Sequence, residues 1–521
     1  MLKSSGAMAA ATLTSRILGM VREMVYARFM GVGWVTDAFL LAFQIPNLFR
    51  RLLGEGALTA AFIPIFKEKE KLHGEEEMWR ASNAVISGLV VAASVIIAVM
   101  MLAISLALAV HQFPEKTELM LQLLRVMFPY LLLVCIAAAM MGILNARGHF
   151  FIPAMGAAML NVVMIASVLW LAPKFGAGLP PGERLPVEIF ALAYGVLAAG
   201  VAQAAFQVPT LWRDGFRYRW VSPWRDETVR RVIVKMIPGT IGIAAYQLNV
   251  TTVQILSFWV GTGIVSSFGY AVRLMELPQG MFGISLATYL LPTLSGMAAE
   301  KNYSEFRTTL RHGLSTLIFL NLIASVLLVT LAEPIVRLLF QYGKFDATAT
   351  DEASFALICL APGLVAFSAA NILVRAFYAL GDTLTPMKIS IFCLMLNLVL
   401  AGALVVPFRQ GGLGIANTLT SLCNVGLLLF TLRKKLGKLE MESLRKTTLT
   451  LVAFALVAGA IAFGGWRLWE EKVGHLTVAQ RLGAVFCSGH RGRRSILARR
   501  AGVQNSRGGG NPGIRAGAVQ T

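Results

Sequence analysis

The chain is a succession of apolar runs about 20 residues long, separated by short polar connections. A run of that length crosses the hydrocarbon core of a bilayer as a helix, and a helix satisfies its own backbone hydrogen bonds in lipid. Run lengths and breaks predict thirteen spans, near 7–31, 35–66, 82–110, 119–144, 151–172, 186–212, 231–260, 264–298, 310–332, 351–380, 386–407, 411–432 and 446–468. The pattern therefore predicts an all-α polytopic membrane protein.

Composition agrees with this class. Of the 521 residues, 56% are hydrophobic and only 14% are charged, which lies well outside the usage of soluble proteins. A net charge of +20 would suggest nucleic-acid binding in a soluble chain, but here Lys and Arg collect in alternate connections and in the C-terminal tail. The positive-inside rule accounts for that distribution, so nucleic acid is excluded as a partner and the N-terminus is predicted to be cytoplasmic.

A weak internal repeat predicts two lobes. Pro153 and Pro386 follow similar Ala-x-Gly turns, and Pro64 and Pro292 stand in similar apolar segments at nearly the same interval. Chance similarity between apolar segments is the alternative. The predicted organisation is an N-terminal lobe of about six helices at 1–220, a C-terminal lobe of about six helices at 221–435, an extra helix at 436–480 and a tail at 481–521.

The tail differs abruptly from the rest of the chain. It has eight Arg, nine Gly and no acidic residue, so it cannot form another membrane span. A fourteenth helix would begin where this composition starts. We therefore interpret residues 481–521 as the product of a shifted or otherwise aberrant reading frame, with a basic interaction tail as the alternative.

Charged residues inside the second apolar run are the first candidates for function. Thr36–Phe66 contains Asp37, Arg50, Arg51 and Glu55, and each buried charge costs at least about 2.5–3.5 kcal/mol at membrane depth. Pro46 and the glycines after Arg51 predict a helix break near Arg50. Arg51 and Glu55 are four residues apart and can pair on one face, which would leave Arg50 to bind a ligand.

Two further runs carry charges of the same kind. Arg16 and Arg22 lie in the first run, and Arg273 and Glu276 lie in the eighth. A purely structural pairing, such as Arg273 with Glu276, is the alternative for each. Because Arg outnumbers acidic residues in these stretches and its planar fork suits phosphate, the pattern favours an anionic phosphate headgroup as substrate.

No signature of enzymatic chemistry was found. The chain has no GxxxxGK[ST] loop, no HExxH and no Cys/His metal spacing, and its five cysteines are scattered singly. We therefore expect no cofactor and no enzyme activity, and leave the presence of a metal site open. An integral-membrane enzyme would need acid pairs or a metal site, and a scaffold would not need buried arginines.

Three stretches carry a resemblance to a known family: TSRILGMVREMVYARFMG at 14–31, the segment Thr36–Phe66, and YAVRLMELPQGMFGISLATYLLPTLS at 270–295. Over about residues 1–470 the chain resembles the MurJ/MviN family of lipid II flippases in the MOP transporter superfamily. The resemblance implies two six-helix lobes, two C-terminal helices and a central cavity. It also implies alternating access that carries an undecaprenyl-pyrophosphate-linked peptidoglycan precursor outward across the bacterial cytoplasmic (inner) membrane.

The resemblance also implies roles for single residues. The essential cavity arginines of the family fall on Arg16, Arg22, Arg50 and Arg273, and matching motif positions hold Asp37, Arg51 and Glu55; with Glu276 these form the supporting cavity or gate set. The expected partners are lipid II, membrane lipid, and a coupling ion or the membrane potential. The alternatives are a flippase for another polyprenyl-pyrophosphate-linked oligosaccharide and a multidrug exporter of the same superfamily. The chain departs from the family at its end, where the fourteenth helix is replaced by the tail.

Overall fold

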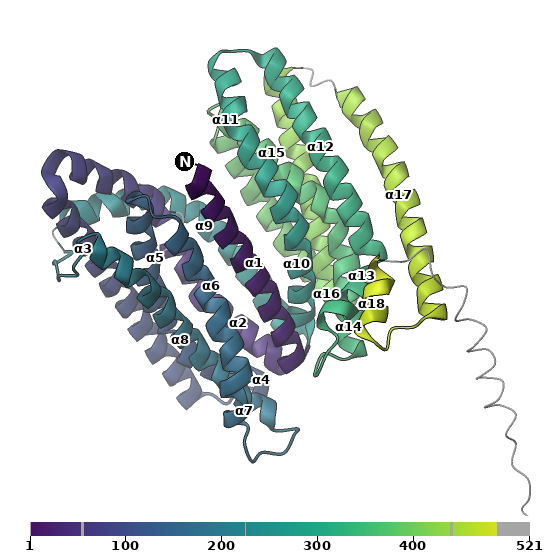
Figure 1. Ribbon diagram of the computed structural model, residues 1–521, viewed down its shortest axis with the longest axis horizontal. Coiled ribbons are helices and arrows are strands. Elements are labelled where there is room, and N and C mark those ends of the chain that lie inside the picture. The colour runs from purple at the N-terminus through teal and green to yellow at the C-terminus, as the bar shows by residue number, and fades with distance from the viewer. Residues whose placement is uncertain (1, 54–56, 225, 438–440, 487–521) are drawn as a thin grey trace, which may run out of the picture.

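The computed structural model describes residues 2–53, 57–224, 226–437 and 441–486, and throughout these ranges the regular structure is helical, with no strand. Figure 1 shows two groups of long helices that diverge from a common end. The all-α fold predicted from the apolar runs is therefore confirmed.

The first group, called the first half below, is built from the helices before residue 214. They are α1 (Leu2–Met30), α2 (Trp34–Leu53), α3 (Ala57–Val110), α4 (Glu115–Met127), α5 (Tyr130–Ala146), α6 (Phe151–Ala166), the π-helical turn η1 (Ser167–Leu171), α7 (Ala172–Phe175) and α8 (Arg184–Arg213).

The second half follows a connection at 214–226. Its helices are α9 (Glu227–Val260), α10 (Ile264–Pro278), the π-helical turn η2 (Gln279–Ile284), α11 (Ser285–Ala299), α12 (Tyr303–Thr330), α13 (Ala332–Phe340), α14 (Ala347–Leu360), the 3₁₀ turn η3 (Ala361–Gly363), α15 (Leu364–Ala379) and α16 (Leu384–Leu436). Two helices come after it, α17 (Met441–Lys472) and α18 (Val478–Phe486).

The two longest helices, α3 and α16, each contain a bend. Gly74, with φ 84°, breaks α3 at a conformation that glycine adopts without strain, and Arg409, with φ 49°, breaks α16. Helices α4 and α5 meet at an angle of 44° on either side of Pro129. Helix α2 continues through Pro46 and ends at Leu53, three residues after Arg50, near which the break was predicted.

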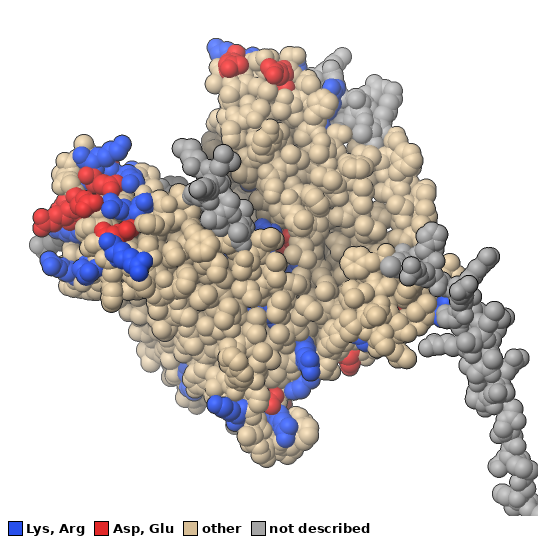
Figure 2. Space-filling view, viewed as in Figure 1, with Lys and Arg blue, Asp and Glu red and all other residues tan. Residues whose placement is uncertain are grey.

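Length and apolarity identify eight helices in the described ranges that can cross a membrane, or nine if α4 and α5 form one span. Figure 2 shows charged side chains gathered at the two ends of the helices, with a broad uncharged surface between them. The chain is therefore a multi-pass membrane protein.

The two halves have largely separate cores, which join at one end and also at the start of α9, where Val229 and Val232 enter the core built by α3 and α5. At the first of these places Phe258 and Val265 of the second half enter the apolar core of the first, and Ala27 of α1 enters a core made by α10, α13 and α14. We call it the closed end; α1 ends there and α4 and α10 begin there. Figure 2 shows the halves diverging away from it, with a notch between them.

The short helix α18 crosses the boundary at residue 481 where composition predicts that the tail begins. Residues 481–486 belong to this helix, and Arg481 Nη1 donates hydrogen bonds to the carbonyls of Gln341 (3.0 Å) and Arg337 (3.3 Å) at the end of α13. Carbonyls at the C-terminus of a helix readily accept hydrogen bonds from an arginine side chain. The remainder of the predicted tail, 487–521, lies outside the described residues.

Candidate functional site: charged contacts between the two halves

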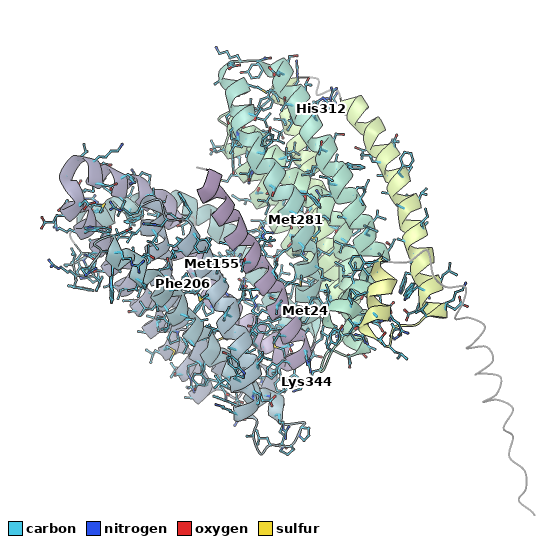
Figure 3. All side chains as sticks on the ribbon, viewed as in Figure 1. Met24, Met155, Phe206, Met281, His312 and Lys344 are labelled. Carbon is cyan, nitrogen blue, oxygen red and sulfur yellow. The ribbon has the colours of Figure 1, made fainter. Side chains whose placement is uncertain are left out.

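Four charged side chains from α1 and α10 meet between the two halves; we call them the inter-half cluster. Glu23 lies at its centre, with Oε1 2.5 Å from Arg22 Nη2 and 3.5 Å from Arg273 Nε. Arg273 Nη1 in turn donates to Glu276 Oε2 at 2.9 Å. Figure 3 labels Met24 on α1 and Met281 on η2, which neighbour this cluster along the two facing elements.

The cluster has an enclosed side and an accessible side. The side chains of Glu23 and Arg22 are 11% and 15% exposed, whereas those of Arg273 and Glu276 are 47% and 51% exposed. Arg22 also lies 5.4 Å from the ring centre of Tyr26, one turn along α1. A ligand can therefore reach Arg273 directly, while Arg22 is held in place by the helix that carries it.

Arg16 reaches the second half one to two turns earlier on α1. Its guanidinium packs so closely on Gly280 in η2 that a Cβ there would collide with it. Gly280 is therefore a position where a missing side chain lets a guanidinium approach the backbone. The structure thus brings Arg16, Arg22 and Arg273 to one surface formed by α1, α10 and η2, with Glu23 and Glu276 beside them.

Arg50 and Arg51, near the end of α2, are not members of the inter-half cluster. Arg50 Nε donates to Asn47 Oδ1 at 3.0 Å, one turn back on the same helix, and Arg51 is exposed. Glu55, the predicted partner of Arg51, lies outside the described residues. The predicted Arg51–Glu55 pair therefore stays a prediction.

Asp37 joins the two halves at the closed end. Its side chain is fully buried, and Oδ2 accepts a hydrogen bond from the Gly263 N–H at 2.7 Å. Oδ1 accepts from the Ser266 N–H at 2.9 Å and from the Ser266 hydroxyl at 2.7 Å. A carboxylate of α2 therefore occupies the N-terminus of α10, where unpaired N–H groups and the helix dipole favour negative charge.

Lys116 of α4 completes this contact from the other side. Its ammonium donates to the carbonyls of Phe258 (2.7 Å) and Gly261 (2.8 Å) at the C-terminus of α9, and lies 3.5 Å from Asp37 Oδ2. Opposite charges from the first half thus hold the end of α9 and the start of α10 at the same turn. We call Asp37, Lys116, Gly263 and Ser266 the turn lock.

A backbone contact lies beside the turn lock. The Lys344 N–H donates to the Arg28 carbonyl at 3.0 Å, joining the last turn of α1 to the turn before α14. Gly31 (φ 59°) and Gly343 (φ 61°) stand where a Cβ would overlap the backbone of the opposite turn. Figure 3 labels Lys344 at this closed end.

These two sets of groups suit two tasks, binding a ligand and holding the two halves together. The inter-half cluster offers guanidinium groups to an anion, and the turn lock holds two helix ends together. Within the described ranges no group of three or more His, Cys, Asp and Glu side chains is arranged to hold a metal ion.

Sequence reasoning missed the two residues that complete these contacts, Glu23 as a bridge and Lys116 as part of the lock. Glu23 joins Arg22 to a residue 250 positions later, which no local spacing reveals. Lys116 did carry a signal, because it lies in the first turn of α4, where the helix dipole disfavours positive charge.

Comparisons with known proteins agree over nearly the whole chain. A family model described as "Lipid II flippase MurJ" matches residues 26–478. The "Probable lipid II flippase MurJ" of Vibrio cholerae is 31% identical over 482 residues, covering 90% of this chain and 89% of that protein. The "Lipid II flippase MurJ" of Burkholderia cenocepacia is 33% identical over 433 residues, covering 81% of this chain and 82% of that protein.

Solved structures show the same fold. A structure titled "Lipid II flippase MurJ, inward closed conformation" matches with a TM-score of 0.74 at 21% identity, covering 96% of this chain and 99% of that one. An inward-facing multidrug resistance MATE family transporter of the MOP superfamily matches with a TM-score of 0.67 at 16% identity, covering 84% and 98%.

Proposed function

This chain belongs to the lipid II flippase MurJ family, and from that premise we propose that it carries lipid II from the cytoplasmic to the outer leaflet of the bacterial cytoplasmic membrane. A flippase moves a lipid and breaks no covalent bond, so the chain acts as a transporter and not as an enzyme. The observation that carries the proposal is the gathering of Arg16, Arg22 and Arg273 at one surface between the two halves. Pyrophosphate is the part of lipid II that such a surface recognises.

Binding of the pyrophosphate exchanges partners within the inter-half cluster. Glu23 and Glu276 together balance the charges of Arg22 and Arg273 when the site is empty, so neither guanidinium is left as an isolated charge at membrane depth. The phosphate oxygens take over Arg273 first, since its side chain is the more exposed, and Arg16 reaches the same ligand from α1. Glu276 holds the Arg273 fork in place through its 2.9 Å hydrogen bond.

Arg50 and Arg51 bind the same headgroup from α2. Asn47 fixes the direction of the Arg50 fork, and Arg51 is exposed. Glu55 is proposed to pair with Arg51, one turn further along the chain. These residues extend the anion site from α1 and α10 to a third helix.

The turn lock is the gate at the outer side of the membrane. The connections at 67–80 and 212–231, which are rich in Lys and Arg, lie away from the closed end, and the positive-inside rule, which counts Lys and Arg, assigns such connections to the cytoplasm. The N-terminus is then cytoplasmic, and the notch between the halves faces the cytoplasm. Breaking the contacts of Asp37 while forming new ones at the notched side would expose the headgroup to the outer face.

The lobes at 1–220 and 221–435 are the parts that move in this cycle, with the helix at 436–480 as an addition to the second. Their largely separate apolar cores support movement as two bodies. Moving one elementary charge through 100 mV is worth about 2.3 kcal/mol, so the membrane potential or a coupling ion can reset the empty carrier.

The test is replacement of Arg50 with Ala, and in parallel of Arg273 with Ala, in a bacterium depleted of its own flippase. We expect each variant to insert into the membrane at normal levels but to leave lipid-linked precursor on the inner leaflet. Wild-type protein in proteoliposomes must expose labelled lipid II on the opposite leaflet. Wild-type-like flipping by Arg50→Ala would reject its role, and absence of flipping by the wild-type chain would reject the function.

The same assay separates the rival substrates. A flippase for another polyprenyl-pyrophosphate-linked oligosaccharide would share the arginines, so competition between lipid II and such a lipid measures which headgroup is preferred. A multidrug exporter would be inhibited by organic cations and not by lipid pyrophosphates. Preferential transport of lipid II is the expected result.

A further inference from the structure

Helix α9 carries a polar face in the middle of its length. Thr240, Gln247, Thr251 and Gln254 follow one another at intervals of seven, four and three residues, which places them on one side of a helix. We call these four residues the α9 polar face. They belong to neither the inter-half cluster nor the turn lock.

This face is turned toward the first half. Val229 and Val232, near the start of α9 and close to the same side, join the core built by α3, and Phe258, at its far end, joins the core built by α2 and α4. Val253 and Leu256, on the opposite side, pack with α16 instead. The α9 polar face therefore lies along the boundary between the halves, bracketed by apolar contacts at both ends.

The side-chain oxygens of this face lack partners. Thr240 Oγ1, Gln247 Oε1, Thr251 Oγ1 and Gln254 Oε1 are all buried, and none has a hydrogen-bond partner among the residues that the structure describes. Gln247 is 3% exposed and Thr251 is 7% exposed. Buried polar atoms are nearly always paired, and each unpaired one costs on the order of 1–3 kcal/mol.

Four such atoms in one line, at the boundary between two moving bodies, indicate that their partner arrives in another state of the protein. We propose that the α9 polar face binds the uncharged hydroxyl and amide groups of the lipid II headgroup once the halves separate. This inference rests on the proposed flippase function and deepens it. The arginines hold the pyrophosphate, and α9 holds the sugar and peptide part that must cross with it.

The chemistry of the face fits that part of the substrate. Amide and hydroxyl side chains donate and accept hydrogen bonds without charge, as sugar hydroxyls and peptide amides do. No ionised group occurs among the four residues, so the face offers nothing specific to phosphate. A site built to pair a substrate hydroxyl discriminates strongly against a substrate that lacks it, because its own polar groups are then left unpaired.

The test is the double variant Gln247→Met, Thr251→Val, which removes two polar groups at nearly constant volume. The matched control is Thr252→Val, on the same helix but exposed and off the polar face. In proteoliposomes, we expect the double variant to flip fluorescent lipid II about ten-fold more slowly, as two neutral hydrogen bonds are lost. It should bind undecaprenyl pyrophosphate, which has no sugar or peptide, with unchanged affinity, and Thr252→Val should resemble wild type in both assays.

A second measurement excludes a merely structural effect. Removing unpaired buried polar atoms should raise the apparent melting temperature of the double variant, so slower flipping cannot be ascribed to unfolding. Lipid II flipping at the wild-type rate would overturn the proposal, and so would an equal loss for both lipids. If wild-type protein itself flips no lipid II, the proposed function fails; if only the variants match wild type, this inference alone fails.

Discussion

The Asp37 carboxylate accepts two hydrogen bonds from Ser266, a residue 229 positions later: 2.9 Å from its N–H and 2.7 Å from its hydroxyl. Lys116 of α4, which also belongs to the first half, lies 3.5 Å from the same carboxylate. The closed end therefore depends on a small number of directional contacts, and its strength can be tested one residue at a time.

Asp37→Ala and Lys116→Met should each weaken the turn lock. Asp37→Ala leaves the first N–H groups of α10 buried without an acceptor, at a cost of about 1–3 kcal/mol for each such group. Because both residues act on one turn, the double variant should lose less stability than the two single losses together. Thermal unfolding in detergent measures this coupling, and strict additivity would contradict a shared lock.

Gly31→Ala should prevent the backbone contact at the closed end. A Cβ there would overlap the Lys344 carbonyl, and φ of 59° costs a non-glycine residue about 1 kcal/mol or more. Gly33→Ala is the matched control, since a Cβ at Gly33 has nothing within 4 Å. We expect lower melting temperature and slower flipping for Gly31→Ala, and near wild-type behaviour for Gly33→Ala. Equal behaviour of the two variants would show that the close contact is not needed.

Glu23→Gln should raise the affinity of the inter-half cluster for an anion. The change removes the negative charge that faces both Arg22 and Arg273, so a pyrophosphate lipid should bind several-fold more tightly while turnover slows. Glu276→Gln should have a smaller effect, because solvent screens its half-exposed carboxylate. Titration with undecaprenyl pyrophosphate and initial flipping rates measure the two effects. Weaker binding by Glu23→Gln would contradict the proposed exchange of partners.

Asp382, in the turn between α15 and α16, should contribute stability that depends on pH. The Lys435 ammonium and the Thr385 N–H hold the pKa of its carboxyl below the usual range. The contribution is therefore fully present above the unfolded pKa of about 3.9 and is lost as pH falls through the lower folded value. Asp382→Asn should cost about 0.2–1 kcal/mol at pH 7 and nothing at the acid end. A cost that does not shrink with acidification would contradict this origin.

The helices were predictable from the sequence because apolar run length fixes them, and so were the breaks within α3 and α16, but the π-helical turns were not. The predicted span at 264–298 consists of three consecutive elements, α10, η2 and α11. The π-helical turn η2 after Pro278 could not be predicted, because apolar content does not distinguish a π-helical turn from an α-helical one. The bend of α16 at Arg409 lies in the gap between the predicted spans 386–407 and 411–432, and there Arg409 Nη2 donates a hydrogen bond to the Thr262 carbonyl at 2.9 Å.

The candidate site was predictable as a list of charged residues but not as an arrangement. Unusual charge in apolar runs identified Arg16, Arg22 and Arg273, and the i, i+3 spacing identified the pair with Glu276. The bridge from Glu23 to Arg273 depends on how α1 packs on α10, and residues 250 positions apart carry no spacing signal. Roles for Arg50, Arg51 and Glu55 remain proposals.

Paired charges at the closed end also matter for a membrane that stores energy as an ion gradient. The three protons of the Lys116 ammonium have the Phe258 and Gly261 carbonyls and the Asp37 carboxylate around them, and the Asp37 oxygens accept three further hydrogen bonds from the start of α10. A seal of this kind offers no vacant site to a passing proton or a hydrated cation. While the turn lock is closed, the transporter can therefore be present in the membrane in many copies without dissipating the ion gradient.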